Sequence, residues 1–111
     1  MDLSDYRKRL DEIDDDILKL FIERMDIAAG IGTWKQENNF PVLDVRRERE
    51  KLQKIEDMSP PEISDYSFTL FSTIMELSRS RQNRILISIC FFRIVSFHGD
   101  SQADMRITVF I

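Results

Sequence analysis

The chain has little of what disulfide-bonded, loop-rich or membrane-spanning proteins need. Cys90 is the only cysteine among 111 residues, which excludes an intrachain disulfide and a thiolate metal cluster. Three glycines and three prolines are too few for the many turns of an all-β fold. No apolar run reaches the roughly 18 residues of a membrane span, and the nearest one, Ile85 to Phe97, is interrupted by Arg93. We therefore expect a protein of the reducing cytoplasm that does not enter a membrane.

An excess of basic residues is also lacking. The chain has 20 acidic and 16 basic residues and a net charge of −4, which gives no reason to expect nucleic acid or an anionic membrane as partner. Its N-terminus, MDLSDYRKRLDEIDDD, is amphipathic and acidic and does not resemble a signal peptide. With 42% apolar and 32% charged residues, the composition is typical of a soluble helical domain.

The clearest pattern is a stripe of apolar residues that recur at three- and four-residue steps. The stripe predicts one long helix that is capped by Asp2 or Ser4 and extends as far as Glu37. At 1.5 Å per residue this helix would be about 50 Å long, more than a small domain needs, and its steps average the coiled-coil value of about 3.5 residues. Asn38 and Pro41 end it. The stripe consists of Leu3, Tyr6, Leu10, Ile13, Ile17, Leu20, Ile27, Ile31 and Trp34.

Two further helices are predicted, so the fold class is all-α with three helices. The second begins at Leu43 or Asp44, ends near Glu56 and is mostly charged. In the third, the segment SPPE at residues 59–62 provides an N-cap serine, a proline at the first helical position and a glutamate for a capping box. This helix is expected to end at about Arg84.

The remaining residues, 85–111, differ from the helical domain at residues 1–84. The segments RILISICFFRIVSF and MRITVFI are rich in β-branched and aromatic residues, and HGDSQAD between them is typical of a turn. A β-hairpin is the plain interpretation, and an extension of the third helix over Ile85 to Phe92 is the alternative. This apolar tail has no role that the sequence explains.

One charged residue stands where the first stripe should be apolar. Arg24 occupies the position between Leu20 and Ile27, and a guanidinium there is costly unless a carboxylate or an anionic ligand meets it. Lys35 follows eleven residues later on the same face, about 16 Å along the axis, so the two could hold a small anion. Arg7 precedes Arg24 by about 25 Å and cannot share that ligand within one straight helix. An antiparallel partner helix would bring in a second Arg7, which predicts a homodimer.

The other two helices add polar residues at helical spacing. Asp44, Arg47 and Glu48 share one face of the second helix, and Ser78 and Gln82 form an i, i+4 pair on the third. The set lacks a histidine, cysteine or serine–base arrangement suited to covalent catalysis. It suits an oxygen-rich dianion and the stabilisation of charge that develops on an ether or alkoxide oxygen.

Four segments in this order resemble the all-helical chorismate mutases. They are YRKRLDEID at 6–14, the pair ER at 23–24 with GTWK at 32–35, PVLDVRRER at 41–49, and ELSRSRQ at 76–82. The resemblance covers about residues 3–84. It implies an intertwined homodimer of three-helix chains with two equivalent sites. The implied reaction is the [3,3] rearrangement of chorismate to prephenate, in aromatic amino acid biosynthesis by the shikimate pathway, without metal or cofactor.

The resemblance also implies a role for each matching residue. Arg24 and the partner's Arg7 would hold the two carboxylates of the substrate. Lys35 and Gln82 would donate hydrogen bonds to the ether oxygen as its bond to the ring breaks.

The other four matching residues would surround the ring. Asp44 and Glu48 would bind the ring hydroxyl, and Arg47 and Ser78 would complete the cage. Two alternatives stay open at this point: an isochorismate-pyruvate lyase on the same scaffold, and a non-catalytic dimerisation or regulatory domain taken from a larger pathway enzyme.

Overall fold

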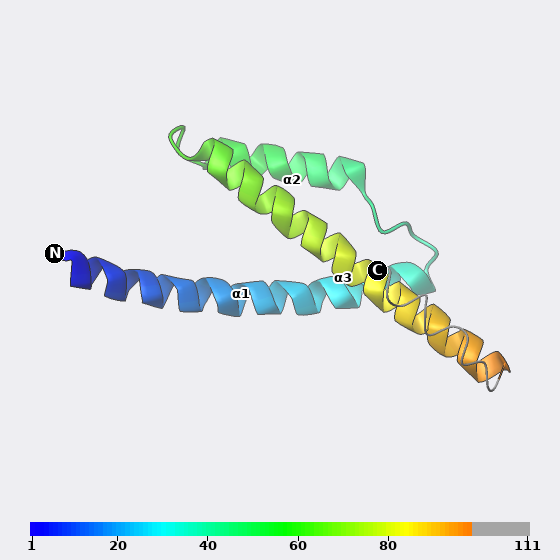
Figure 1. Cartoon of the computed structure of the whole chain (residues 1–111). Helices are drawn as coiled ribbons and strands as arrows, with labels where there is room; N and C mark the ends of the chain where they lie inside the picture. The colour runs from blue at the N-terminus through cyan, green and yellow to red at the C-terminus, as the bar shows by residue number, and fades with distance from the viewer. Residues whose placement is uncertain (99–111) are drawn as a thin grey trace.

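The described part of the protein consists of three helices and no strand. The computed structural model describes the backbone of residues 1–98 and the side chains of residues 1–84. Its helices are α1 (Leu3–Glu37), α2 (Val45–Met58) and α3 (Ser64–His98) (Figure 1). The all-α prediction is confirmed.

The ends of α1 lie where the sequence places them. Asp2 is the N-cap: its side chain accepts from the backbone N–H of Asp5, and the Asp5 side chain accepts in return from that of Asp2, which completes a capping box. Asn38 is the C-cap, and Asn39 adopts a φ of 57°, a left-handed conformation that asparagine tolerates better than most residues. Local hydrogen bonding alone therefore accounts for both ends.

The predicted start of the third helix is wrong. Ser59 is the C-cap of α2, where its hydroxyl donates to the carbonyl of Ile55 at 2.7 Å and so does not cap a following helix. A turn follows, in which the N–H of Ile63 donates to the carbonyl of Pro60 at 3.0 Å, and α3 begins only at Ser64. The serine is used to end one helix instead of starting the next.

The predicted first strand of the tail is also wrong. Helix α3 continues without a break through residues 85–98, in agreement with the alternative of a helix extended beyond Arg84. Extension of an existing helix is favourable because each added residue gains a hydrogen bond without a new nucleation step. This gain outweighs the β-propensity of the residues in the segment. The second half of the proposed hairpin lies outside the described residues.

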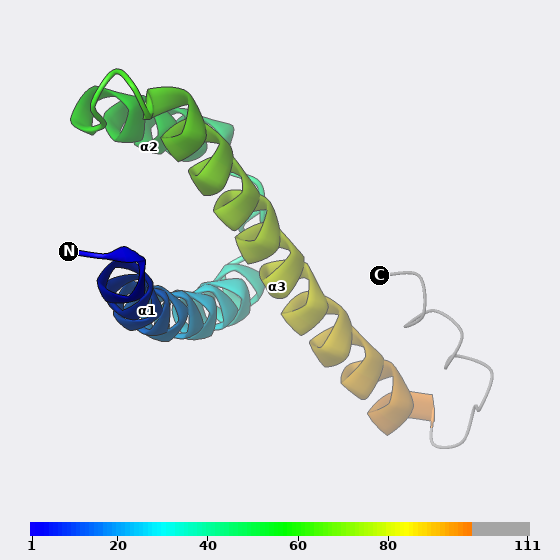
Figure 2. The same cartoon turned by 60° about the vertical axis from the view of Figure 1, so that its left-hand side comes forward.

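The three helices are arranged so that α3 crosses the C-terminal half of α1 and also packs against α2. The N-terminal half of α1 extends away from the other two helices (Figures 1 and 2). The radius of gyration is 19.0 Å, whereas a compact domain of this length has about 13 Å. The chain is therefore elongated.

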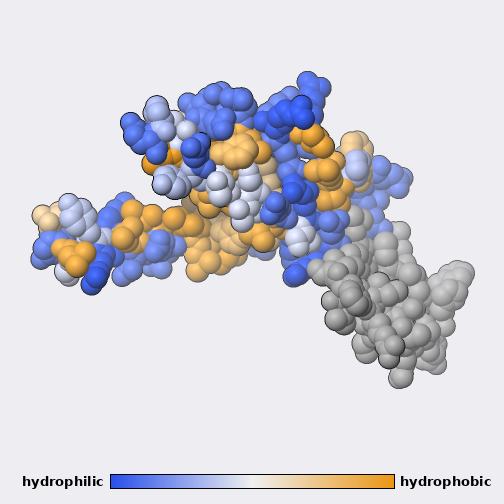
Figure 3. Space-filling view, turned by 45° about the horizontal axis from the view of Figure 1, so that its top comes forward, coloured by the Kyte–Doolittle hydropathy of each residue, from blue (hydrophilic) through white to orange (hydrophobic). Residues whose placement is uncertain are grey.

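Little of the chain is buried. Ala28 and Met75 are the only buried apolar residues among those whose side chains are described. The stripe on the N-terminal half of α1 is exposed: Leu10 is 56% and Leu20 is 63% accessible. Figure 3 shows hydrophobic residues exposed along this arm. No helix within the described residues has the length and apolar character to cross a membrane.

Candidate active site

One face of each helix lines a common pocket of about 310 Å³. The lining residues follow helical spacing: α1 contributes positions 24, 27, 28, 31 and 35, α2 with its N-cap contributes 44, 47, 48 and 51, and α3 contributes 75, 78, 79 and 82. The pocket brings together seven of the eight side chains singled out in the sequence: Arg24, Lys35, Asp44, Arg47, Glu48, Ser78 and Gln82.

Arg24 meets a hydroxyl in the pocket, not a carboxylate. Its Nη1 donates to Oγ of Ser78, and that hydroxyl donates in turn to the carbonyl of Ile74 at 2.9 Å. Among the residues with described side chains, no acidic group forms an ion pair with Arg24. Within the part of the chain whose side chains are described, the positive charge of Arg24 is therefore not paired with a carboxylate, an arrangement that suits an anionic ligand.

Lys35 is held by the loop that follows its own helix. Its Nζ donates to the carbonyl oxygen of Val42 at 2.7 Å, and the side chain is half-buried. An ammonium group has three donors, so this bond fixes the position of Nζ and leaves two donors for a ligand. The cation is therefore pre-positioned at the edge of the pocket.

The acidic residues of the pocket come from the start of α2. Asp44 is the N-cap of this helix, and its Oδ1 accepts from the backbone N–H of Arg47 at 3.0 Å. One turn later, Oε1 of Glu48 accepts from Nη1 of Arg79 on α3. Both carboxylates are thus oriented by contacts within the chain, and each has an oxygen that these contacts do not use.

Gln82 lies where α3 comes close to α1. A Cβ added to Gly32 of α1 would be only 3.0 Å from Cα and 3.3 Å from Cβ of Gln82. The side chain of Gln82 lines the pocket, the residue is 7% exposed, and its buried Oε1 has no hydrogen-bond partner among the residues with described side chains. The absence of a side chain at Gly32 therefore lets Gln82 lie deep between the two helices.

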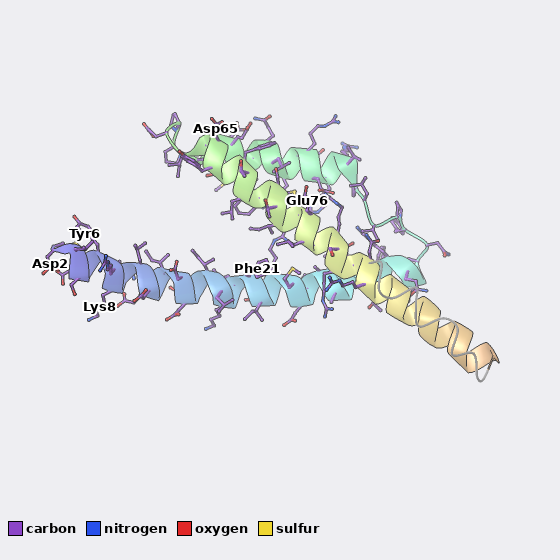
Figure 4. The ribbon with its side chains drawn as sticks, in the orientation of Figure 1. Asp2, Tyr6, Lys8, Phe21, Asp65 and Glu76 are labelled. Carbon is purple, nitrogen blue, oxygen red and sulfur yellow. The ribbon has the colours of Figure 1, made fainter. Side chains whose placement is uncertain are left out.

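Arg7 is the one predicted site residue that does not line the pocket. It is exposed on the first turns of α1. Its neighbours Tyr6 and Lys8 lie at the free end of this helix, well away from α2 and α3 (Figure 4). Within one chain, Arg7 does not reach the residues around Arg24.

Sequence reasoning missed two cations that line the same pocket, Lys51 and Arg79. The signal was present: Lys51 is seven residues after Asp44, and Arg79 is three residues before Gln82, so each falls on a face already identified. Both stand in highly charged segments, where a solvated surface residue is the ordinary interpretation.

The arrangement defines a class of protein. Five cations, two carboxylates, a buried hydroxyl and a buried amide surround a pocket large enough for a small organic molecule. Fixed positive groups of this kind bind carboxylates and stabilise negative charge that develops on oxygen. The fold and the pocket thus define an all-helical domain suited to binding a small, oxygen-rich anion.

Comparisons with known proteins identify the family. The family model described as chorismate mutase type II matches residues 6–83, and the chain belongs to this family. A bifunctional chorismate mutase/prephenate dehydratase of Buchnera aphidicola subsp. Acyrthosiphon pisum is 33% identical over 87 residues, 77% of this chain and 23% of the relative. A chorismate mutase of Methanocaldococcus jannaschii is 29% identical over 86 residues, 76% of this chain and 87% of the relative.

The two kinds of relative differ in length. The chain spans about a quarter of the two Buchnera bifunctional proteins, 23% of one and 24% of the other. No solved structure matches the chain significantly.

Proposed function

We propose that this chain is a chorismate mutase that converts chorismate to prephenate at the pocket between its three helices. The observation that carries the proposal is the meeting of seven residues, matched to the family segment by segment, around one pocket. Family membership supports the same activity. We assign the mutase domain to residues 1–84 and assign no role to the tail at residues 85–111. A cytoplasmic location stays a prediction.

The reaction is a rearrangement within one molecule. The ether C–O bond breaks while a C–C bond forms, so no nucleophile takes part, and the site has to hold a compact chair-like conformer. Arg24, supported by Ser78, binds a substrate carboxylate. Lys35 and Gln82 donate to the ether oxygen, which gains negative charge in the transition state. Because the charges are already in place, the site does not reorganise during the reaction.

The ring of the substrate is held from α2. Asp44 and Glu48 bind the ring hydroxyl. The hydroxyl has a single proton, which Glu48 accepts with Oε2, the oxygen that its contact with Arg79 does not use, while Asp44 borders the same hydroxyl. Arg47 closes the pocket on the side of α2.

A homodimer is part of the proposal. Two observations support it: the apolar stripe of α1 is exposed, and Arg7 lies on that same uncovered arm. The accessible surface is 9368 Å² for a chain of 13.2 kDa, whereas a compact monomer of that mass exposes about 6400 Å². An antiparallel second copy would cover the stripe and bring its own Arg7 to the pocket, where it would bind the second carboxylate of the substrate.

Subunit complementation tests whether Arg7 acts in trans. We expect Arg7→Ala and Arg24→Ala to be nearly inactive alone, each with a roughly 10²-fold or larger loss of kcat/KM, since each removes a charged hydrogen bond to a carboxylate. Mixed and re-equilibrated, the two variants form heterodimers in which one site is intact, and activity returns to a quarter or less of the unaltered enzyme. Absence of recovery, with subunit exchange demonstrated by mass spectrometry, would contradict the assignment.

The pH profile tests the role of Gln82. An amide has no proton to lose near neutrality, so we expect kcat to be nearly constant between mildly acidic and mildly basic pH. The profile is measured by following chorismate absorbance in buffers of constant ionic strength. A sharp fall just above neutrality would show that a titrating group, and not Gln82, donates to the ether oxygen.

Product analysis separates the mutase from the lyase. The purified chain is incubated with chorismate and, in parallel, with isochorismate, and the products are separated by chromatography. We expect prephenate from chorismate. Release of pyruvate from isochorismate as the main reaction would favour the lyase, and turnover of neither substrate by a proven dimer would favour a regulatory domain.

A further inference from the structure

Arg79 forms the one ion pair between helices among the residues with described side chains. Its Nη1 donates to Oε1 of Glu48, 31 residues earlier in the chain. The side chains of Arg79 and Glu48 are 30% and 21% exposed, and both residues line the pocket. The other two ion pairs, Arg9–Glu12 and Arg46–Glu50, are within single helices and more than half exposed on both sides.

The two carboxylate oxygens of Glu48 differ in their contacts. A carboxylate has about four lone-pair positions on two oxygens, and Arg79 bonds to Oε1. Oε2 takes part in no hydrogen bond within the described residues. Glutamate loses considerable rotamer freedom when it is immobilised, so a glutamate already held by an arginine pays less of that cost on binding a ligand.

We propose that Arg79 is a positioning residue that holds Glu48 in the orientation in which Oε2 accepts from the ring hydroxyl of the substrate. Arg79 acts through Glu48 and does not contact the substrate. This inference rests on the proposed mutase function and adds a ninth residue to the eight that the family resemblance implied. It also explains why a cation is placed beside a carboxylate in a pocket that binds an anion: the pair neutralises Glu48, which would otherwise repel the ligand.

The hydroxyl is not altered in the rearrangement, so its hydrogen bond to Glu48 is present in both the ground state and the transition state. Loss of such a bond raises KM and changes kcat much less. For Arg79→Met we therefore expect KM for chorismate to rise roughly tenfold, the effect of one charge-assisted hydrogen bond, while kcat falls by less than about threefold. Arg79→Lys keeps a cation beside Glu48 and should restore much of the loss.

The experiment measures kcat and KM for the unaltered chain and four variants: Arg79→Met, Arg79→Lys, Glu48→Gln, and the double variant Glu48→Gln with Arg79→Met. Arg81→Met is the matched control, because Arg81 is on the same helix and does not line the pocket. If Arg79 acts through Glu48, the KM of the double variant is close to that of Glu48→Gln alone. Circular dichroism establishes that each variant is folded.

Three results would overturn the inference while leaving the proposed function intact. They are an unchanged KM in Arg79→Met, a fall confined to kcat, or effects that multiply in the double variant. If Arg79→Met does not fold, a further variant, Arg79→Gln, is compared with Arg79→Lys, and KM must rise more for glutamine than for lysine. Failure of the unaltered chain to convert chorismate would instead overturn the proposed function, and the inference with it.

Discussion

Replacement of Lys35 by alanine is expected to lower kcat roughly 10²- to 10³-fold, the usual effect of removing a donor to an oxygen that gains charge in the transition state. The rise in KM should be much smaller, because the ether oxygen of bound chorismate carries little charge before its bond to the ring breaks. In the structure, Nζ of Lys35 is fixed by the carbonyl of Val42, so the charge is already at the pocket before the substrate binds.

The measurement is steady-state kinetics on Lys35→Ala with chorismate. Lys54→Ala serves as control, since Lys54 is an exposed lysine on α2 that does not line the pocket. Because Lys35 also contacts the loop before α2, thermal unfolding is compared for both variants. A large rise in KM with kcat nearly unchanged would show that Lys35 only binds the substrate.

Replacement of Gly32 by alanine is expected to affect both stability and catalysis. The added methyl group would lie 3.0 Å from Cα, 3.2 Å from the carbonyl oxygen and 3.3 Å from Cβ of Gln82, so α3 has to move away from α1. Overpacking of this kind costs about 1–3 kcal/mol of the free energy of unfolding. The displacement of Gln82 should lower kcat roughly 10- to 100-fold, since small shifts of a catalytic group are costly.

Gly30 provides the matched control for this substitution. It is on the same helix two residues earlier, and a Cβ added there would have no atom of the described residues within 4 Å. Gly30→Ala should therefore keep kcat and raise the free energy of unfolding by up to about 1 kcal/mol, through the higher helix propensity of alanine. Equal effects of the two substitutions on kcat and on Tm would contradict the proposed role of Gly32.

Much of the fold can be predicted from residues that are close together in the sequence. The ends of α1 follow from Asp2 and Asn38, and the start of α2 follows from Asp44, because a cap is made by residues within one turn of each other. The start of α3 could not be read in the same way. Ser59 can bond forward as an N-cap or back to Ile55, and only the folded chain shows which bond forms.

Most of the residues that line the pocket could also be predicted from the sequence. Residues on one helical face are neighbours by geometry, so the sequence by itself determined that Arg24 and Lys35 share one face, as do Asp44, Arg47 and Glu48, and the structure shows that all five line the pocket. The resemblance to a family put these faces in one site. Whether Arg24 pairs with a carboxylate was left open by the sequence, and among the residues with described side chains it does not.

The tertiary structure alone decided the contacts between helices. The bond from Arg24 to Ser78 and the ion pair from Arg79 to Glu48 join residues 54 and 31 positions apart. The approach of Gly32 to Gln82 likewise depends on where α3 crosses α1. Spacing within a helix is set by backbone geometry that every sequence shares, whereas the distance between two helices depends on the packing of all the side chains between them. For that reason the charged residues of this site can be predicted from the sequence, whereas the contacts between them depend on the tertiary structure.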